Sequence, residues 1–382
     1  MEGIFVSTSF RRRSRLVVGG AAVAALVAVG LAPGAAADRP GDGVAFWLTV
    51  NHNNDGESDV SPRDALDGDE NVIGTQGGVA YFASVLKEAR SAANVKPRGD
   101  KVKRGSILVS SGDNFLASPS FSASLANGVF YDALALDALR YDAIVLGNHD
   151  FDFGPEVLAD FISDGFSRPG MPPYLSANLD FSAEPALQAL ADDGVIAAST
   201  VVKVKGEKVG IVGATTENLP FISSPRDVVV NEVEPAAQAE IDALEAAGVN
   251  KIVFVSHLQD IEADVALAGV LTGVDVMVAG GGDELLANPD DPLLPSDSPS
   301  DVYGGYPIIA TGGDGAEVPV VTTSGQYGYL GNLVVGFDED GNVVEVDDDR
   351  SGPLRVVSES VGPDGVRPSG SLNARVVRPV DA

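Results

Sequence analysis

The chain has 382 residues, 45% of them apolar, and a formal net charge of −30 from 55 acidic and 25 basic side chains. This length allows one large core, or a core with a small appendage. The acidic balance argues against a nucleic acid polymer or an anionic membrane as partner, although a salt-adapted surface would also explain it. Cysteine is absent, which excludes disulfides and thiolate-ligated zinc sites. A site for anions would need its own positive charge, and bound metal ions are the simplest source.

Residues 1–37 have the pattern of an export signal. A cluster of arginines at 11–15 precedes an apolar stretch at 16–31, and Ala35-Ala36-Ala37 forms a small-residue cleavage site. The alternative is an uncleaved membrane anchor, but the stretch is short and weakly apolar against the ~20 residues that a span needs. We therefore expect an exported protein, periplasmic, cell-surface or secreted, with no stable membrane span after signal cleavage.

Beyond residue 37, short apolar runs alternate with amphipathic stretches. Patterns typical of buried strands occupy Val44–Val50, Ser106–Ser110, Asp142–Leu146, Lys251–Val255 and Val274–Ala279. Patterns typical of helices occupy Gly78–Ala93, Val129–Arg140, Pro155–Ser163 and Pro235–Ala247. Two hairpins are predicted, Ser199–Val204 with Lys208–Gly213 and Leu333–Phe337 with Asn342–Val346. The alternation predicts an α/β sheet covered by helices and extended by antiparallel strands.

Two later segments lack this periodicity. Asn288–Asp301 is dense in Asp, Pro and Ser, and predicts an exposed loop. Residues 347–382 contain scattered Gly, Pro, Ser and charged side chains, and predict a linker-like or loosely packed C-terminal tail.

Polar segments follow the predicted strands, where ligands collect in α/β sheets. Asp55 and Glu57 flank a glycine and can turn both carboxylates toward one ion. A calcium loop is the alternative there, but Pro62 stands where such a loop needs its last carboxylate. Asp113 directly follows a strand and a glycine, which suits either a carboxylate shared between two metals or an ordinary turn.

The segment Gly147-Asn148-His149-Asp150 is the most specific of these. Asn148 offers a neutral oxygen ligand, and Asp152, three residues after His149, can orient the imidazole. A fourth region has two parts, His257 after one strand and the glycine-rich residues 280–284 after the next. Either part alone suits a structural role as well as a ligand role.

Together, these segments resemble the 5′-nucleotidase branch of the calcineurin-like metallophosphoesterases. Members of that family carry Asp-x-His, Gly-Asp, Gly-Asn-His-Glu/Asp, a later His and Gly-His-x-His, in this order. The similarity runs from about Ala45 to about Phe337. It implies a four-layer α/β/β/α sandwich with mixed sheets, spanning residues 38–346. The family's C-terminal nucleotide-binding domain has no counterpart in this pattern, and we expect it to be absent here.

The resemblance also implies two divalent metal ions. It assigns Asp55 and Glu57 to one ion, Asn148 and His257 to the other, and Asp113 to both. Asp283 stands where the family has a second His or Gln, and is assigned to metal too. Glu57 stands where the family has His. Because Glu57 and Asp283 enrich the site in carboxylates, we expect Mn, Mg or Ca in preference to Zn.

One ligand position differs more severely. Gly281 stands where the family has a His ligand, so that coordination place would be filled by water, by Glu284 or by nothing. The resemblance implies that His149 acts on the leaving group and that Asp152 orients it.

The implied activity is hydrolysis of a small phosphate ester outside the cytoplasm, by attack of a hydroxide held between the metals. A nucleotidase and a cyclic nucleotide phosphodiesterase are the candidates. The alternative is a degenerate domain with a binding or cell-surface structural role, which the altered ligand positions favour.

Overall fold

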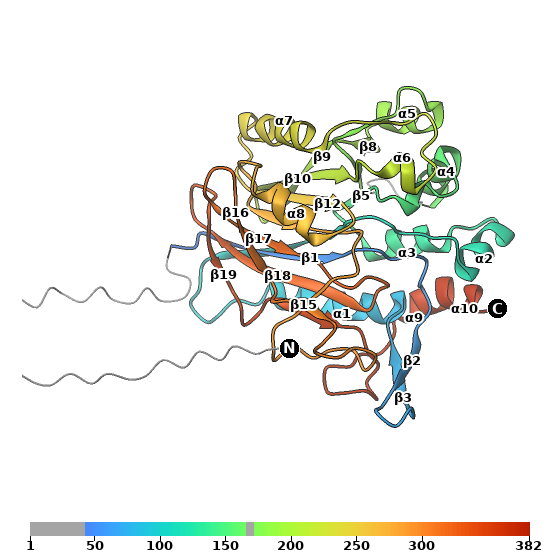
Figure 1. Cartoon of the computed structure of the whole chain (residues 1–382). Coiled ribbons are helices and arrows are strands. Elements are labelled where there is room, and N and C mark those ends of the chain that lie inside the picture. Colours follow the sequence, from blue (N-terminus) through green and yellow to red (C-terminus); the bar gives the residue numbers. More distant parts are fainter. Residues whose placement is uncertain (1–42, 166–171) are drawn as a thin grey trace, which may run out of the picture. The chain divides into compact units, whose positions relative to one another are not determined.

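Two mixed β-sheets form the centre of the domain (Figure 1). The computed structural model describes residues 43–165 and 172–382, so the expected export signal lies outside the described residues. The first sheet has the order β19-β18-β1-β4-β5-β6-β8, with β20 also paired to β18. The second has the order β16-β17-β13-β12-β10-β9.

The first sheet contains β1 (Phe46–Asn53), β4 (Lys103–Ser110), β5 (Ala143–Val145), β6 (Tyr174–Leu175), β8 (Ile196–Ala197), β18 (Tyr329–Phe337), β19 (Val343–Val346) and β20 (Gly352–Arg355). The second contains β9 (Ser199–Val204), β10 (Glu207–Thr215), β12 (Ile252–His257), β13 (Val276–Val278), β16 (Ile308–Thr311) and β17 (Glu317–Val321). Three small pairs are β2 (Arg63–Leu66) with β3 (Val72–Gln76), β7 (Leu179–Asp180) with β11 (Val229–Val230), and β14 (Leu285–Leu286) with β15 (Val302–Gly304).

The helices are α1 (Val79–Ala93), α2 (Pro119–Asn127), α3 (Tyr131–Leu139), α4 (Pro155–Gly165), α5 (Pro185–Asp192), α6 (Leu219–Ile222), α7 (Val233–Ala246), α8 (Ile261–Ala268), α9 (Gly370–Leu372) and α10 (Arg378–Val380). A short 3₁₀ turn, η1, covers His149–Phe151, and a π-helical turn, η2, covers Asn373–Val377. None of these helices, within the residues that the structure describes, is both long and apolar enough to cross a membrane.

Side-chain alternation along the strands separates two apolar cores. In β4, Ile107 and Val109 join a core cluster that continues through the second sheet to Ile241 of α7. Leu108 points to the opposite face and joins the core under α1, α3 and α4. The layers are therefore helix, sheet, sheet and helix, and the α/β/β/α architecture is confirmed.

The predicted elements lie where the periodicity placed them, with shifted ends. The two hairpins are confirmed as the antiparallel pairs β9–β10 and β18–β19. The first strand extends beyond its predicted end at Val50 to Asn53, so His52 lies within β1 and is fully buried. Its Nε2 lies 2.8 Å from the Tyr306 hydroxyl, which makes it a core residue. Residues 288–301 contain no helix or strand, yet Leu294 is buried in a small apolar cluster.

The C-terminal segment corrects the prediction of a linker-like tail for residues 347–382. β20 pairs with β18, and Val356 and Val357 are fully buried. Further along, Leu372 and Val376 join the same core as Phe82 of α1. These apolar residues are few and irregularly spaced between glycines and prolines, so no helical or strand period marks them in the sequence.

This packing predicts that truncating a C-terminal core residue destabilises the domain. Leu372→Ala is expected to lower the free energy of unfolding by about 2–5 kcal/mol, because Leu372 is only 3% exposed and its loss leaves a cavity. Denaturant unfolding of the two proteins measures the difference. Leu125→Ala on α2 is the control, since Leu125 is 51% exposed and should change stability by about 0.5 kcal/mol or less. Equal stability of Leu372→Ala and the parent would contradict the packed position of the C-terminus.

Candidate metal centre

The predicted site residues come from the carboxyl ends of parallel strands in both sheets. Asp55, Asp113 and Asn148 follow β1, β4 and β5, which are parallel neighbours in the first sheet. His257 ends β12 of the second sheet. Its Nδ1 lies 2.7 Å from the carbonyl oxygen of Ser111, a contact that joins the two sheet edges. The polar segments therefore converge, because the edges at which the parallel strands of the two sheets end lie next to each other.

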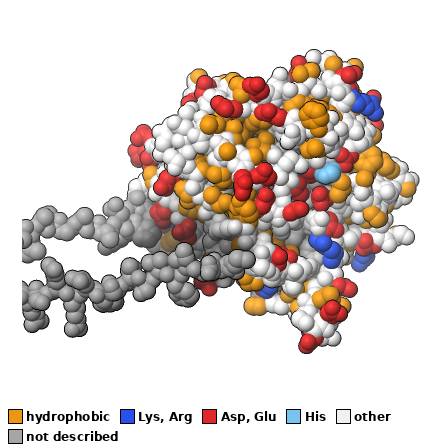
Figure 2. Space-filling model, viewed as in Figure 1, with side chains coloured by type: hydrophobic (Ala, Val, Ile, Leu, Met, Phe, Trp, Pro, Cys, Tyr) orange, Lys and Arg blue, Asp and Glu red, His pale blue; other side chains and the backbone are white. Residues whose placement is uncertain are grey.

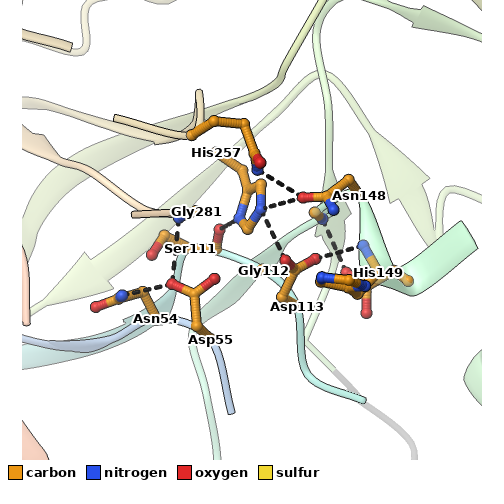
Figure 3. A network of polar contacts seen from close by, with 12 residues as sticks. Asn54, Asp55, Ser111, Gly112, Asp113, Asn148, His149, His257 and Gly281 are labelled. Atoms are coloured by element: carbon orange, nitrogen blue, oxygen red, sulfur yellow. Dashed lines mark hydrogen bonds and ion pairs between the residues drawn. The ribbon is translucent and has the colours of Figure 1, made fainter. Parts of the chain in front are cut away.

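Asp55, Asp113 and His257 form the centre of the site. One ligand atom from each lies within 4.8 Å of the other two, and all three side chains are buried. Figure 3 shows the carboxylates of Asp55 and Asp113 directed toward the same space beside His257. His257 Nε2 lies 3.0 Å from Asp113 Oδ2, and the backbone N–H of Gly281 donates to Asp55 Oδ2 at 3.2 Å.

The backbone around these carboxylates is unusual. Asp55, Glu57 and Asp113 all have φ near 49°, in the left-handed region that non-glycine residues seldom occupy. Gly147 lies against Asp113, and a Cβ on Gly147 would come within 2.2 Å of Asp113 Oδ1. The glycine before Asn148 is thus required to let two strand-end loops approach each other.

Burial and mutual repulsion set the charges at this centre. Burial raises the pKa of Asp55 above its ordinary value, and the Asp113 carboxylate raises it further, against the opposing effect of His257. Burial by itself would lower the pKa of His257, but the carboxylates of Asp113 and Asp55 outweigh it and raise the pKa. In the described part of the chain, neither carboxylate pairs with Lys or Arg, so the imidazole is their partner.

The segment after β5 places Asn148 and His149 on one side of this centre. Asn148 Oδ1 lies 2.8 Å from His257 Nε2, and the backbone N–H of His149 donates to Asp113 Oδ1 at 2.7 Å. The Asp113 carboxylate therefore fixes the backbone position from which the His149 side chain extends. Figure 2 shows a histidine side chain reaching the surface between acidic side chains.

His149 and Asp152 form a hydrogen-bonded pair, as the sequence predicts. His149 Nδ1 lies 2.7 Å from Asp152 Oδ2, and Ser223 Oγ donates to Asp152 Oδ1 at 2.9 Å. The hydrogen bond to Asp152 raises the pKa of His149 to about 9, despite the opposing effect of partial burial. Its side chain is 32% exposed, whereas His52 and His257 are fully buried. Of the histidines, His149 is therefore the one accessible to a substrate.

Two predicted ligands, Glu57 and Asp283, are not members of this buried group. Glu57 Oε2 accepts a hydrogen bond from Gln326 Nε2 at 3.0 Å, and Glu57 is not among the three residues grouped within 4.8 Å. Asp283 is exposed and is not in that group either. The Glu284 carboxylate accepts from the backbone N–H of Ile261 at 3.3 Å, at the start of α8.

The structure also brings in residues that the sequence did not single out as site residues. Asp150 is buried behind Asp113, and its carboxylate accepts the backbone N–H groups of Gly147 and Asn114 at 2.8 and 3.3 Å. Asp150 thereby ties the Asp113 loop to the Asn148 loop. Its position directly after His149 in the sequence indicates that Asp150 is near the site. Its inward orientation, however, depends on the η1 turn.

The donor set fits divalent cations. Two buried carboxylates, an imidazole and an amide oxygen converge with too little positive charge to balance them, and a divalent ion would supply it. The predominance of oxygen suits Mn or Mg, and one imidazole is compatible with either.

Comparisons with known proteins agree with this geometry. The human 5′-nucleotidase is 35% identical over 306 residues, which cover 78% of this chain and 48% of that protein. The structure of a 5′-nucleotidase precursor from Thermus thermophilus matches with a TM-score of 0.72 at 31% identity, over 88% of this chain and 59% of that one. A calcineurin-like phosphoesterase from Bacillus subtilis shares the fold, with a TM-score of 0.61 at 16% identity, over 88% of this chain and 97% of that one.

No protein-family model matches the chain. The chain spans about half the length of the curated relatives that it matches first. Over most of its length, the chain is nonetheless similar to proteins named 5′-nucleotidase and has the fold of a calcineurin-like phosphoesterase, which confirms the resemblance that its motifs predict.

Proposed function

We propose that this chain is a metal-dependent hydrolase of phosphate esters, with nucleotides as the substrate class to test first. The buried group of Asp55, Asp113 and His257, next to the His149–Asp152 pair, carries the proposal. Its similarity to proteins named 5′-nucleotidase supports the choice of substrate class. Export, for which the pattern of residues 1–37 is the support, would place the activity outside the cytoplasm.

The proposed site would hold two divalent ions. Asp113 would serve both, Asn148 and His257 would serve the second, and Asp55, Glu57 and Asp283 would serve the first. When bound, such ions supply positive charge to phosphoryl oxygens and lower the pKa of coordinated water. Asp55 and Asp113 would hold that charge in a buried position, where its effect on a substrate is least screened.

His149 has a separate role in this proposal. Asp152 engages its Nδ1, so Nε2 is the atom that exchanges a proton with a substrate. A protonated imidazole at this point assists departure of the leaving oxygen. Ser223 holds Asp152 from the other side and keeps the pair oriented.

The test is hydrolysis of AMP and p-nitrophenyl phosphate by the purified protein, stripped of metal and then supplied with Mn, Mg, Ca or Zn. We expect activity to require added metal and two ions to bind per chain, counted by elemental analysis. A binding-only domain is the second candidate, because Gly281 replaces a family ligand and Asp283 is exposed. Two bound ions without turnover of either ester would favour that candidate.

The carboxylate at position 57 predicts a metal preference. The parent should be more active with Mn or Mg than with Zn, and Glu57→His should move the ratio of kcat/KM values toward Zn by about tenfold, or ~1.4 kcal/mol. Metal-reconstituted samples assayed with one ester measure this ratio. Glu88→His, on the exposed face of α1, adds an imidazole away from the site and should leave the ranking unchanged. An unchanged ranking in Glu57→His would remove Glu57 from the ligand set.

A further inference from the structure

Gly281 leaves a space beside His257, and the side-chain amide of Gln259 fills it. A Cβ on Gly281 would lie 2.6 Å from Gln259 Nε2 and 2.9 Å from His257 Nε2. Gln259 Nε2 also donates to Asn148 Oδ1 at 2.6 Å. The amide therefore lies among Gly281, His257 and Asn148, at the position from which a side chain on residue 281 would enter the site.

The backbone of Gln259 is unfavourable for its side chain. Its φ is 83°, in the left-handed region, which costs a residue with a Cβ about 1–2 kcal/mol relative to ordinary helical geometry. Gln259 is followed by Asp260, whose carboxylate caps α8 by accepting the backbone N–H of Glu262 at 2.8 Å. A glycine at 259 would allow the same turn without that strain. The strained glutamine indicates that its amide has a function.

The surroundings of the amide indicate what that function is. Asn148 Oδ1 lies within hydrogen-bond distance of both Gln259 Nε2 and His257 Nε2, and His257 Nε2 is 3.0 Å from Asp113 Oδ2. These atoms, which could all ligate a metal, form a chain of contacts that runs from the amide of Gln259 through Asn148 and His257 to Asp113. Rotation of that amide by half a turn exchanges its oxygen and nitrogen, which places Oε1 among them.

We propose that Gln259 is a ligand of the ion held by Asp113, Asn148 and His257, with its amide oxygen in the coordination place that Gly281 cannot fill. This inference rests on the proposed metal-dependent function. Glu284, the protein alternative for that place, has its carboxylate at the backbone N–H of Ile261 instead. The resulting set of three oxygens and one imidazole nitrogen is typical of sites for Mn or Mg.

Titration of the metal-stripped full chain with MnCl2, followed by calorimetry, tests this role. The parent should bind two ions. Gln259→Gly removes the amide and relieves the backbone, so the variant should fold normally, yet one of its two sites should weaken by at least ~10–100-fold, the loss typical of an outer-shell partner. Gln259→Glu keeps an oxygen at this position and should bind Mn as tightly as the parent or more tightly.

The glutamate variant separates a ligand from a residue that only positions Asn148. Both Gly and Glu remove the N–H that Asn148 Oδ1 accepts, so a positioning role predicts that both variants weaken the site, and that result would overturn the proposal. Two unchanged Mn sites in Gln259→Gly would also overturn it, while leaving the proposed hydrolase intact. A parent that binds no Mn would overturn both. Gln238→Ala on α7, where Gln238 bonds to Asp242, is the control and should retain both sites.

Discussion

Replacing Asp113 by asparagine is expected to remove both bound metal and hydrolysis. Asp113 Oδ2 lies 3.0 Å from His257 Nε2, and its Oδ1 accepts the backbone N–H of His149, so this carboxylate contacts both halves of the site. Asparagine keeps the size but removes the negative charge that would be shared by two cations. Because metal ions contribute several kcal/mol of transition-state stabilisation, the rate should fall by ~10³-fold or more. Elemental analysis and ester hydrolysis measure the two losses together.

The matched control for this substitution is Asp275→Asn. The Asp275 carboxylate accepts the backbone N–H of Ile252, at the opposite end of β12 from His257. Burial raises the pKa of Asp275 to about 7, and the amide oxygen of an asparagine can still accept the Ile252 N–H. This control should keep its metal and its rate. Parental metal content in Asp113→Asn would refute the shared-carboxylate assignment.

The second large effect is expected at His149. His149→Ala should keep both ions, because the ring bonds to Asp152 and the metal ligands lie on other side chains. The rate on AMP should nevertheless fall by roughly 10²–10⁴-fold, the usual contribution of a general acid or base. Metal content and kcat, measured on the same preparation, separate a lost proton donor from a lost ligand.

Substrates with different leaving groups test whether His149 is the proton donor. A proton donor matters most for a poor leaving group such as a ribose hydroxyl, so the loss in His149→Ala should shrink for p-nitrophenyl phosphate. Asp152→Asn should produce a smaller loss with the same trend, since it disturbs only the orientation of the ring. An equal loss across all leaving groups would give His149 a different role.

Strand-end motifs made the centre of the site predictable. Asp113 and Asn148 each follow a short apolar run, and parallel strands end at one edge of a sheet, so their sequence positions already imply proximity. His257 is the last residue of β12, in the other sheet. Its place beside Asp113 depends on how the two sheets pack, and only the family resemblance gave that relation in advance.

Residues outside such motifs could not be assigned in the same way. Gln259 follows a strand-end histidine by two positions, but its amide reaches Asn148 only because residue 281 has no side chain. That dependence joins positions 22 residues apart in the sequence. The packing of the C-terminal segment was not predicted for a related reason. Leu372 and Val376 are buried because of their tertiary position, and no repeating apolar pattern marks them in the sequence.

The left-handed backbone at Asp55, Glu57 and Asp113 lowers the stability of the fold at the residues that the proposed function needs. Each position costs about 1–2 kcal/mol relative to a relaxed conformation, against a total folding free energy of roughly 5–15 kcal/mol for a typical domain. Glycine at any of them would relieve that strain and remove a carboxylate. Laboratory evolution for heat resistance alone would therefore accept glycine at these three positions, and would yield a more stable domain that no longer holds its ions.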